Sequence, residues 1–455
     1  MLRSQRYSFV VRYFDATRLI QRGTKRLPTG VDRVDLAYLS WLQESGKVGL
    51  VINRARGCSH LEDAVAGEVV GQLSKAWSGV SEQSVSSLMD GMVTAASPWR
   101  RLRQWWCRRG PVARLAAIED LEELAKHHLD ELDPFDPSWV WHDYPMQGDW
   151  SHLSEPSIFF GVSHSLLGRT AYLKQLARCP ELKRVFFIHD LIPCDHPEFC
   201  RPLEGHRHLL RIRNALRYGT HLIANSNYTR DRLEHWRVLA GLPERSVEVI
   251  PIGLDERVPA PVQATAVANS DARPYFVMLG TVEPRKNHLL LLRIWQRFVK
   301  TLPKEKIPVL KVIGASGWEN DEVVRQLDGS GSLEPHVEWL RGVGDEMLWK
   351  ELQGASAMLF PSKVEGWGMP LVEALAMGVP VIASDISAFD EAGAGVPDRY
   401  SVDDDEGWAQ AILDYAGDGS EKRQAQISRL QTYQAPSWQE HFNQLEAFVG
   451  ADELR

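Results

Sequence analysis

The sequence predicts an α/β protein built from two doubly wound parallel-sheet domains. Its 455 residues are about three times a typical domain, so two or three compact units are expected. In both halves, short apolar runs alternate with segments of helical periodicity, which is the pattern of parallel strands joined by crossover helices. The segment 256–274 is rich in Pro, Ala and Ser and lacks this periodicity. We therefore predict an inter-domain linker there.

The first predicted domain covers residues 1–262. Six apolar runs are its expected strands: 7–11, 48–52, 157–160, 184–188, 221–225 and 247–251. The stretch of roughly 60–150, between the second and third strands, is richer in helix-forming and charged residues. We interpret it as a helical insertion.

The second predicted domain covers residues 270–435, where the alternation is more regular. Its strands are expected at 275–279, 308–313, 337–340, 356–360 and 380–384, with an amphipathic helix at 289–300. Such alternation favours a parallel sheet that is covered by helices on both faces. A final helix is expected within 436–455.

Composition excludes several classes of protein. Apolar residues make up 44% and charged residues 25%, as in ordinary globular proteins, and no apolar run reaches the ~18 residues of a membrane-spanning helix. The N-terminus lacks the pattern of a secretory signal, and the five cysteines form no C-x-x-C pair, so we expect a cytoplasmic protein. A net charge of −8 argues against nucleic acid as a partner.

A loop that could bind a phosphate group follows the strand at 356–360. Neither G-x-x-x-x-G-K-[ST] nor G-x-G-x-x-G occurs, which weakens the ATPase and dinucleotide oxidoreductase hypotheses. Residues 365–385 instead read EGWGMPLVEALAMGVPVIASD. Gly366 and Gly368 allow the backbone to approach a ligand closely, and Pro370 suits the first turn of a helix. A helix N-terminus at the carboxyl edge of a parallel sheet favours anions.

Two glutamates frame this loop. Glu365 precedes it and Glu373 lies eight residues later, in the opening of the helix. Either one alone is better explained as a solvated or dipole-complementing carboxylate. Together with the glycines they suggest acceptors for sugar and ribose hydroxyls on either side of a diphosphate. At this point the sequence resembles the retaining nucleotide-sugar glycosyltransferases of family 4.

This resemblance implies the GT-B fold, in which two facing Rossmann-like domains enclose a donor and acceptor cleft. It also implies the catalytic residues: His189, in FIHDLIP, contacting the sugar near the reacting carbon, and Glu365, positioning the sugar. The donor-binding residues that it implies are Gly30, Arg285, Lys286, Gly366, Trp367, Gly368, Met369, Pro370, Leu371 and Glu373. Many members carry an arginine directly after the glycine of the 280–287 loop, where this chain has Thr281.

The implied function is transfer of a sugar from a GDP-mannose-like, UDP- or dTDP-sugar to a glycan or polyprenyl-linked glycan in bacterial surface polysaccharide biosynthesis. No cofactor and no obligatory metal are expected, because the nucleotide sugar is a co-substrate. Two alternatives remain. A hydrolase could use Glu365 and Glu373 as acid and base, although Arg285 and Lys286 would then have no task. A catalytically silent GT-B subunit could instead serve as a scaffold in polysaccharide assembly.

The segment 97–115, SPWRRLRQWWCRRGPVARL, is a candidate membrane-surface anchor. It holds six arginines and three tryptophans and no acidic residue. Arginine with interfacial tryptophan is typical of segments that lie at anionic lipid headgroups. An exposed helix whose tryptophans cover the core of the insertion is the alternative. The first interpretation predicts peripheral attachment to the cytoplasmic face of the inner membrane.

Overall fold

The computed structural model describes residues 11–22, 28–46, 48–54, 57–61, 67, 69–71, 73, 114–115, 117–135, 156–261, 273–328, 333–417 and 419–450. The chain divides into two compact units. Unit 1 lies within 1–197, 202–251 and 441–455, and unit 2 within 198–201 and 252–440. The division after Pro251 precedes the predicted domain end at 262, and the chain returns to unit 1 at His441.

Unit 1 contains a seven-stranded sheet with the order β3-β2-β1-β4-β5-β6-β7. Its strands are β1 (Val11–Asp15), β2 (Val48–Arg54), β3 (Gly57–Leu61), β4 (Ser157–Gly161), β5 (Leu182–Ile188), β6 (His221–Ala224) and β7 (Val247–Val249). All neighbouring pairs are parallel except β2 and β3. The central strands β4 and β6 are buried along their whole length, as expected for a sheet covered on both faces.

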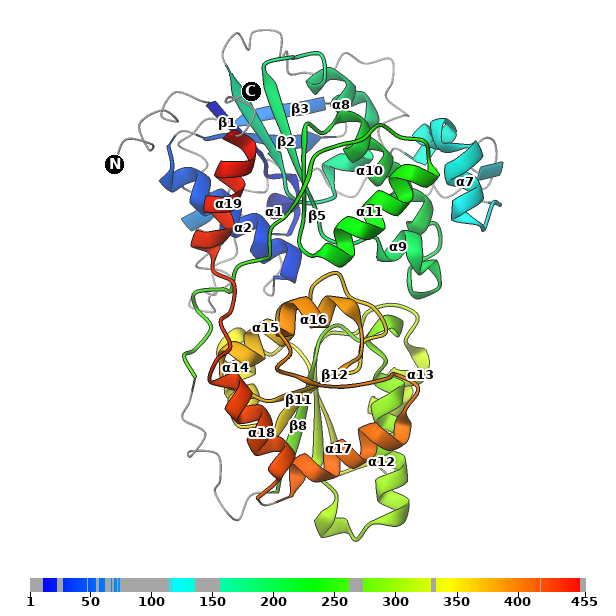
Figure 1. Ribbon diagram of the computed structural model, residues 1–455. Helices are drawn as coiled ribbons and strands as arrows, with labels where there is room; N and C mark the ends of the chain where they lie inside the picture. The colour runs from blue at the N-terminus through cyan, green and yellow to red at the C-terminus, as the bar shows by residue number, and fades with distance from the viewer. Residues whose placement is uncertain are drawn as a thin grey trace. The chain divides into compact units, whose positions relative to one another are not determined.

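Helices cover both faces of this sheet (Figure 1). They are α1 (Thr17–Arg22), α2 (Gly30–Glu44), α7 (Leu121–His127), α8 (Thr170–Leu176), α9 (Ile192–Asp195), α10 (Glu204–Tyr218), α11 (Asn227–Leu239) and α19 (Trp438–Gly450). The main core cluster joins α8, α10 and α11 to the sheet. On the other face, α19 packs against α2, where Trp41 stacks on Phe442 with ring centroids 4.5 Å apart.

Unit 2 contains a six-stranded parallel sheet with the order β10-β9-β8-β11-β12-β13. Its strands are β8 (Tyr275–Leu279), β9 (Val309–Ile313), β10 (Val337–Leu340), β11 (Ala357–Phe360), β12 (Val381–Ser384) and β13 (Asp398–Tyr400). Its helices are α12 (His288–Thr301), α13 (Asp321–Asp328), α14 (Asp345–Gln353), α15 (Met369–Ala376), α16 (Ser387–Gly393), α17 (Asp405–Ala416) and α18 (Glu421–Leu430). A core around Trp295 and Trp408 joins α12 and α17 to the sheet (Figure 1).

The strand positions follow the apolar runs of the sequence closely. Ten of the eleven predicted strands overlap β2 and β4–β12 within one to two residues at most ends. For the first predicted strand, 7–11, residues 7–10 lie outside the described part of the chain; β1 begins at Val11 and continues to Asp15 through VRYFD, whose polar residues interrupt the apolar run. Two short strands at the sheet edges, β3 and β13, were not predicted from the sequence.

Most of the arginine- and tryptophan-rich segment 97–115 lies outside the described residues. At its C-terminal end, Arg114 pairs with Glu131 and Leu115 is buried in the core of unit 1. In the parts of the chain that the structure describes, no helix combines the length and apolar character needed to cross a bilayer.

Candidate functional site

The predicted donor-binding residues of unit 2 lie on two neighbouring loops. β8 and β11 are adjacent in the parallel sheet, so the loops that follow them leave the same carboxyl edge. The first loop passes through a short 3₁₀ turn, Pro284–Lys286, before α12. The second leads into α15, and the Lys363 N–H donates to the Arg285 carbonyl at 2.8 Å. A backbone hydrogen bond thus fixes the two loops to each other.

Glu365 forms ion pairs with both predicted phosphate-binding cations. Arg285 Nη1 donates to Glu365 Oε2 at 2.6 Å, and Lys286 Nζ donates to Glu365 Oε1 at 2.5 Å. The Ser362 hydroxyl donates to Oε1 at 2.8 Å, and Arg285 also pairs with Glu283 at 2.7 Å. Glu283 and Ser362 were not among the predicted site residues, although Glu283 stands in the same GTVEPRKN segment as the cations.

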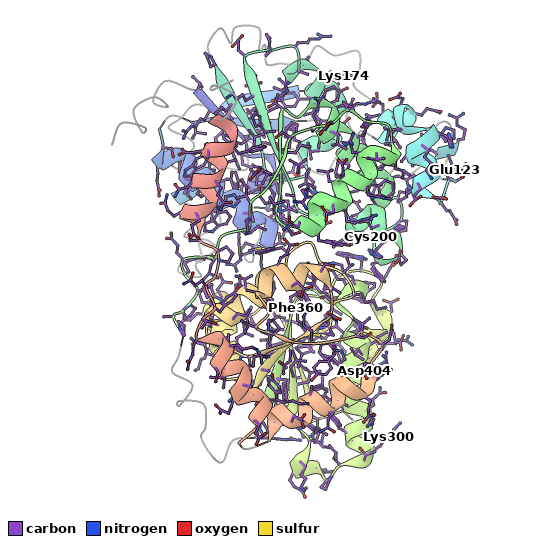
Figure 2. All side chains as sticks on the ribbon, viewed as in Figure 1. Glu123, Lys174, Cys200, Lys300, Phe360 and Asp404 are labelled. Carbon is purple, nitrogen blue, oxygen red and sulfur yellow. The ribbon has the colours of Figure 1, made fainter. Side chains whose placement is uncertain are left out.

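The electrostatics of this cluster show which groups carry charge. Burial alone would raise the pKa of Glu365, but Arg285 and Lys286 outweigh it and hold that pKa at about 2. Burial lowers the pKa of Lys286, against the opposing effect of Glu365. Burial also raises the pKa of Glu283. Lys286 lies 4.9 Å from the ring centroid of Phe360, the β11 residue labelled in Figure 2, so one side of its ammonium faces an aromatic ring.

The glycine-containing loop requires its glycine at position 368. Gly368 has φ 112°, in the region that favours glycine, and a Cβ there would lie 2.9 Å from Cε1 of Phe389. α15 begins at the next residue, with Pro370 in its first turn. The Leu371 side chain is fully buried and that of Trp367 nearly so. Leu371 can therefore meet a ligand only through its backbone.

Glu373 lies apart from the ion pairs of Glu365. It lines a pocket of about 200 Å³, including space open to solvent, in unit 2. The other lining residues are Ile252, Gly253, Leu254, Asp255, Trp367, Met369 and Val372. Ile252–Asp255 were not among the predicted site residues. Their place in the pocket lining depends on tertiary packing that no local pattern encodes.

In unit 1, His189 follows β5 at the carboxyl edge of the sheet, as predicted. Its Nε2 lies 2.9 Å from the Val162 carbonyl, so Nε2 carries the proton that is donated there. The His189 N–H donates to Nε2 of His164 at 3.2 Å, and Asn225 donates to the His189 carbonyl at 2.7 Å. Burial lowers the pKa of His189 to about 4, so its imidazole is neutral at physiological pH.

Gly30 is exposed at the first position of α2, beside a pair of arginines. Asp32, in the first turn of α2, is fully buried and accepts hydrogen bonds from Arg18 Nε at 2.7 Å and Arg22 Nε at 3.1 Å. Its Oδ2 also accepts from the Thr29 N–H at 2.7 Å, which caps the helix. Arg18, Arg22 and Asp32 therefore surround the start of α2 with two positive charges and one negative charge.

Two further aspartates are buried near this edge. Asp15 ends β1, and its Oδ1 accepts from the backbone and hydroxyl of Thr17, whereas Oδ2 has no hydrogen-bond partner in the described part of the chain. Both carboxyl oxygens of Asp35, on α2, are buried and have no hydrogen-bond partner among the residues that the structure describes. Burial raises the pKa of Asp35 well above its usual range, with Arg18 opposing and Asp15 and Asp32 reinforcing that effect. Burial likewise raises the pKa of Asp15 to about 6.

Comparison with known families gives a match for the part of the chain that contains Arg285, Lys286 and Glu365. The family model described as "Glycosyl transferases group 1" matches residues 263–430, all of which lie in unit 2. Residues 263–430 are thus similar to the group 1 glycosyltransferase domain. The predicted family resemblance is confirmed for this part of the chain.

Two curated relatives illustrate the likeness. The serotype-specific mannosyltransferase WbdA of Escherichia coli is 30% identical over 219 residues, which are 45% of this chain and 26% of that protein. O-antigen chain mannosyltransferase B of Escherichia coli is 38% identical over 120 residues, which are 26% of this chain and 30% of that protein. The aligned region thus spans less than a third of the length of either relative.

Solved structures show the fold over nearly the whole chain. The crystal structure of HepE from Anabaena in complex with UDP matches with a TM-score of 0.58 at 14% identity, over 97% of this chain and 100% of that one. Sucrose-phosphate synthase from Thermosynechococcus elongatus matches with a TM-score of 0.58 at 14% identity, over 98% and 100%. The predicted GT-B class, with two Rossmann-like domains, is confirmed.

Proposed function

We propose that the protein is a retaining glycosyltransferase that moves a sugar from a nucleotide sugar to a glycan or lipid-linked glycan in bacterial surface polysaccharide biosynthesis. The observation that carries this proposal is the placement of Arg285 and Lys286 beside the glycine-containing loop, at the carboxyl edge of a group 1 glycosyltransferase domain. Because the curated relatives above are named as mannosyltransferases, a GDP-mannose-like donor is the first to test.

The chemistry follows from where charge develops. When the bond between the sugar and the diphosphate breaks, negative charge grows on the leaving group and positive charge on the sugar. Arg285, Lys286 and the N-terminus of α15 would stabilise the departing diphosphate, since cations and helix N-termini favour developing anions. Glu373 would hold the ribose, and Glu365 would position the sugar. The departing phosphate would accept the proton of the acceptor hydroxyl, so the proposal assigns no step to a metal ion.

His189 is assigned a role in turnover. Its contact with the sugar would matter most as the ring flattens towards the transition state. We therefore expect His189→Ala to lower kcat about 10²-fold while changing donor affinity much less. Steady-state kinetics and donor titration of the same variant measure the two effects. Equal losses would make His189 a binding residue, and no loss would leave it a purely structural link between β4, β5 and β6.

Donor binding and transfer separate this proposal from its alternatives. Isothermal titration with GDP, UDP and dTDP, followed by transfer assays with the matching sugar nucleotides, is the test. We expect one nucleotide to bind and its sugar nucleotide to support transfer. Binding without transfer to any acceptor would favour a silent scaffold. Release of free sugar in place of transfer would favour a hydrolase.

Attachment to an anionic membrane through 97–115 is a second part of the proposal, and the arginine and tryptophan content of that segment supports it. Six basic residues would each contribute about 1 kcal/mol near an anionic surface. Such attachment would bring the enzyme to a lipid-linked acceptor.

A further inference from the structure

Glu365 contacts both cations that the proposed function assigns to the donor diphosphate. The carboxylate is bidentate: one oxygen is 2.6 Å from Arg285 Nη1 and the other is 2.5 Å from Lys286 Nζ. All three side chains are largely buried, with 9% of Glu365, 8% of Lys286 and 20% of Arg285 exposed. Pairs that are this short and this desolvated are strong interactions, and solvent screens them little.

The surrounding residues hold the carboxylate in this position. The Ser362 hydroxyl donates to Oε1, which is the oxygen that also accepts from Lys286. The backbone hydrogen bond between Lys363 and Arg285 ties the loop of Glu365 to the loop of the cations. The contact is therefore part of the packed carboxyl edge of unit 2, and does not depend on a freely rotating surface side chain.

The charges of the cluster nearly cancel. Arg285 and Lys286 supply two positive charges, and Glu365 with Glu283 supplies up to two negative charges. A diphosphate that approaches these cations meets donors already bonded to a carboxylate. It must displace that carboxylate or share the cations with it, and either route reduces the free energy gained from binding.

We propose that Glu365 serves as an internal stand-in for the diphosphate, occupying Arg285 and Lys286 when no nucleotide is bound and weakening the hold on the nucleoside diphosphate product. This inference rests on the proposed function and extends it to product release. The carboxylate keeps two buried cations satisfied in the free enzyme, where an unpaired buried charge would be costly. After the sugar has been transferred, the Glu365 carboxylate competes with the nucleoside diphosphate for the two cations. This competition speeds release of the diphosphate.

Glu283 provides a matched control. It is equally buried and pairs with Arg285 at 2.7 Å, but among the described residues it forms no ion pair with Lys286. Glu283→Gln and Glu365→Gln therefore remove the same charge from the same cluster. Glu365→Gln removes the carboxylate that contacts both cations and leaves Arg285 paired with Glu283, whereas Glu283→Gln removes a contact to Arg285 alone.

The experiment is titration of inorganic pyrophosphate, and of whichever nucleoside diphosphate binds the wild-type protein, into the wild type and these two variants. We expect Glu365→Gln to lower the Kd of both ligands about tenfold or more, and Glu283→Gln to lower it distinctly less. Glu365→Gln should also slow transfer, because the contact that positions the sugar is lost.

The outcomes separate the two levels of the proposal. If no nucleotide or pyrophosphate binds any of the three proteins, the proposed function fails. If the wild type binds nucleotide but Glu365→Gln binds it no more tightly, the stand-in role is wrong and the proposed function stands. Equal tightening in the two variants would show only a general effect of charge, and would also overturn the stand-in role.

Loss of the Glu365 carboxylate leaves Arg285 paired with Glu283 but leaves the buried Lys286 without an ion-pair partner among the described residues, so a second variant is tested together with Glu365→Gln. Glu365→Asp keeps the charge but is one methylene shorter, and cannot hold both cations at their present distances from the same backbone position. We expect it to bind pyrophosphate with an affinity between those of the wild type and Glu365→Gln. Should Glu365→Gln fail to fold, an unchanged affinity in Glu365→Asp would overturn the inference.

Discussion

Replacing Lys286 with Met is expected to lower kcat/KM for sugar transfer by about 10²- to 10³-fold, the usual cost of removing one group that stabilises transition-state charge. Lys286 is buried, and its ammonium group donates to Glu365 at 2.5 Å. Methionine has a similar length and retains the contact with Phe360, so the substitution removes mainly the charge and the hydrogen bonds. The loss should appear both as weaker nucleoside diphosphate binding and as slower transfer.

The same change should lower the stability of the folded protein, because the buried Glu365 carboxylate loses its ion pair with Lys286 and keeps the one with Arg285. Breaking a buried pair by removing one partner costs about 3–5 kcal/mol. Kinetics should therefore be measured below the melting transition of the variant, with circular dichroism as a check on folding. Lys363→Met is the control: this exposed neighbour also lies near an aromatic ring but forms no ion pair among the described residues. A folded Lys286→Met protein with unchanged nucleotide affinity would remove Lys286 from the donor site.

The sheets were largely predictable because their central strands are continuous apolar runs. β11 and β12, for example, are buried at every position, and AMLF and VIAS stand out in the sequence. β3 (GCSHL) and β13 (DRY) are short edge strands with polar residues, and edge positions bury too little surface to impose an apolar pattern. β1 was harder to predict for a different reason. Arg12 and Asp15 within it are buried although they are polar, so the strand has no continuous apolar run.

The candidate site was predictable in its parts but not in its connections. The spacing of EGWGMPLVE and the cations in EPRKN indicated two loops at the carboxyl edge of one sheet. No sequence pattern indicated that Glu365 would bond to residues 79 and 80 positions away, or that Glu373 would line a pocket with Ile252–Asp255 instead of joining the cluster. Contacts over such separations depend on the order of strands, which local patterns leave open.

Asp35 illustrates a second limit of sequence interpretation. The family resemblance implied that PTGVDRV, residues 28–34, is a loop near a diphosphate, with Gly30 as its functional residue. In the structure, α2 begins at Gly30, and its two aspartates are both fully buried in different environments. Asp32 is held by Arg18 and Arg22, whereas neither oxygen of Asp35 has a hydrogen-bond partner among the described residues. A carboxyl group without compensating bonds in such a place is more stable protonated.

Replacing Asp35 with Asn is therefore expected to raise the stability of the protein relative to wild type as the pH rises. The folded state holds the Asp35 proton more tightly than the unfolded chain, whose aspartates have a pKa of about 4. Above that pH the folded state binds more protons, so the wild-type free energy of unfolding falls with rising pH, by up to about 1.4 kcal/mol per pH unit. The amide side chain of the variant does not titrate and escapes this loss. Asp15, whose pKa is raised to about 6, adds a smaller loss between about pH 4 and 6 in both proteins.

The measurement is chemical unfolding of wild type, Asp35→Asn and Asp32→Asn at pH 5, 6, 7 and 8. Asp32 is the matched control, because it lies on the same helix and is equally buried but has a lowered pKa. Burial alone would raise the pKa of Asp32, but Arg18, Thr29 and Arg22 outweigh the effect of burial. The stability that Asp32 contributes is present above about pH 4 and is lost only below it. Asp32→Asn should thus be less stable than wild type by a nearly constant amount over this range. A difference between Asp35→Asn and wild type that does not grow from pH 5 to pH 8 would show that Asp35 is ionised and compensated in the folded protein.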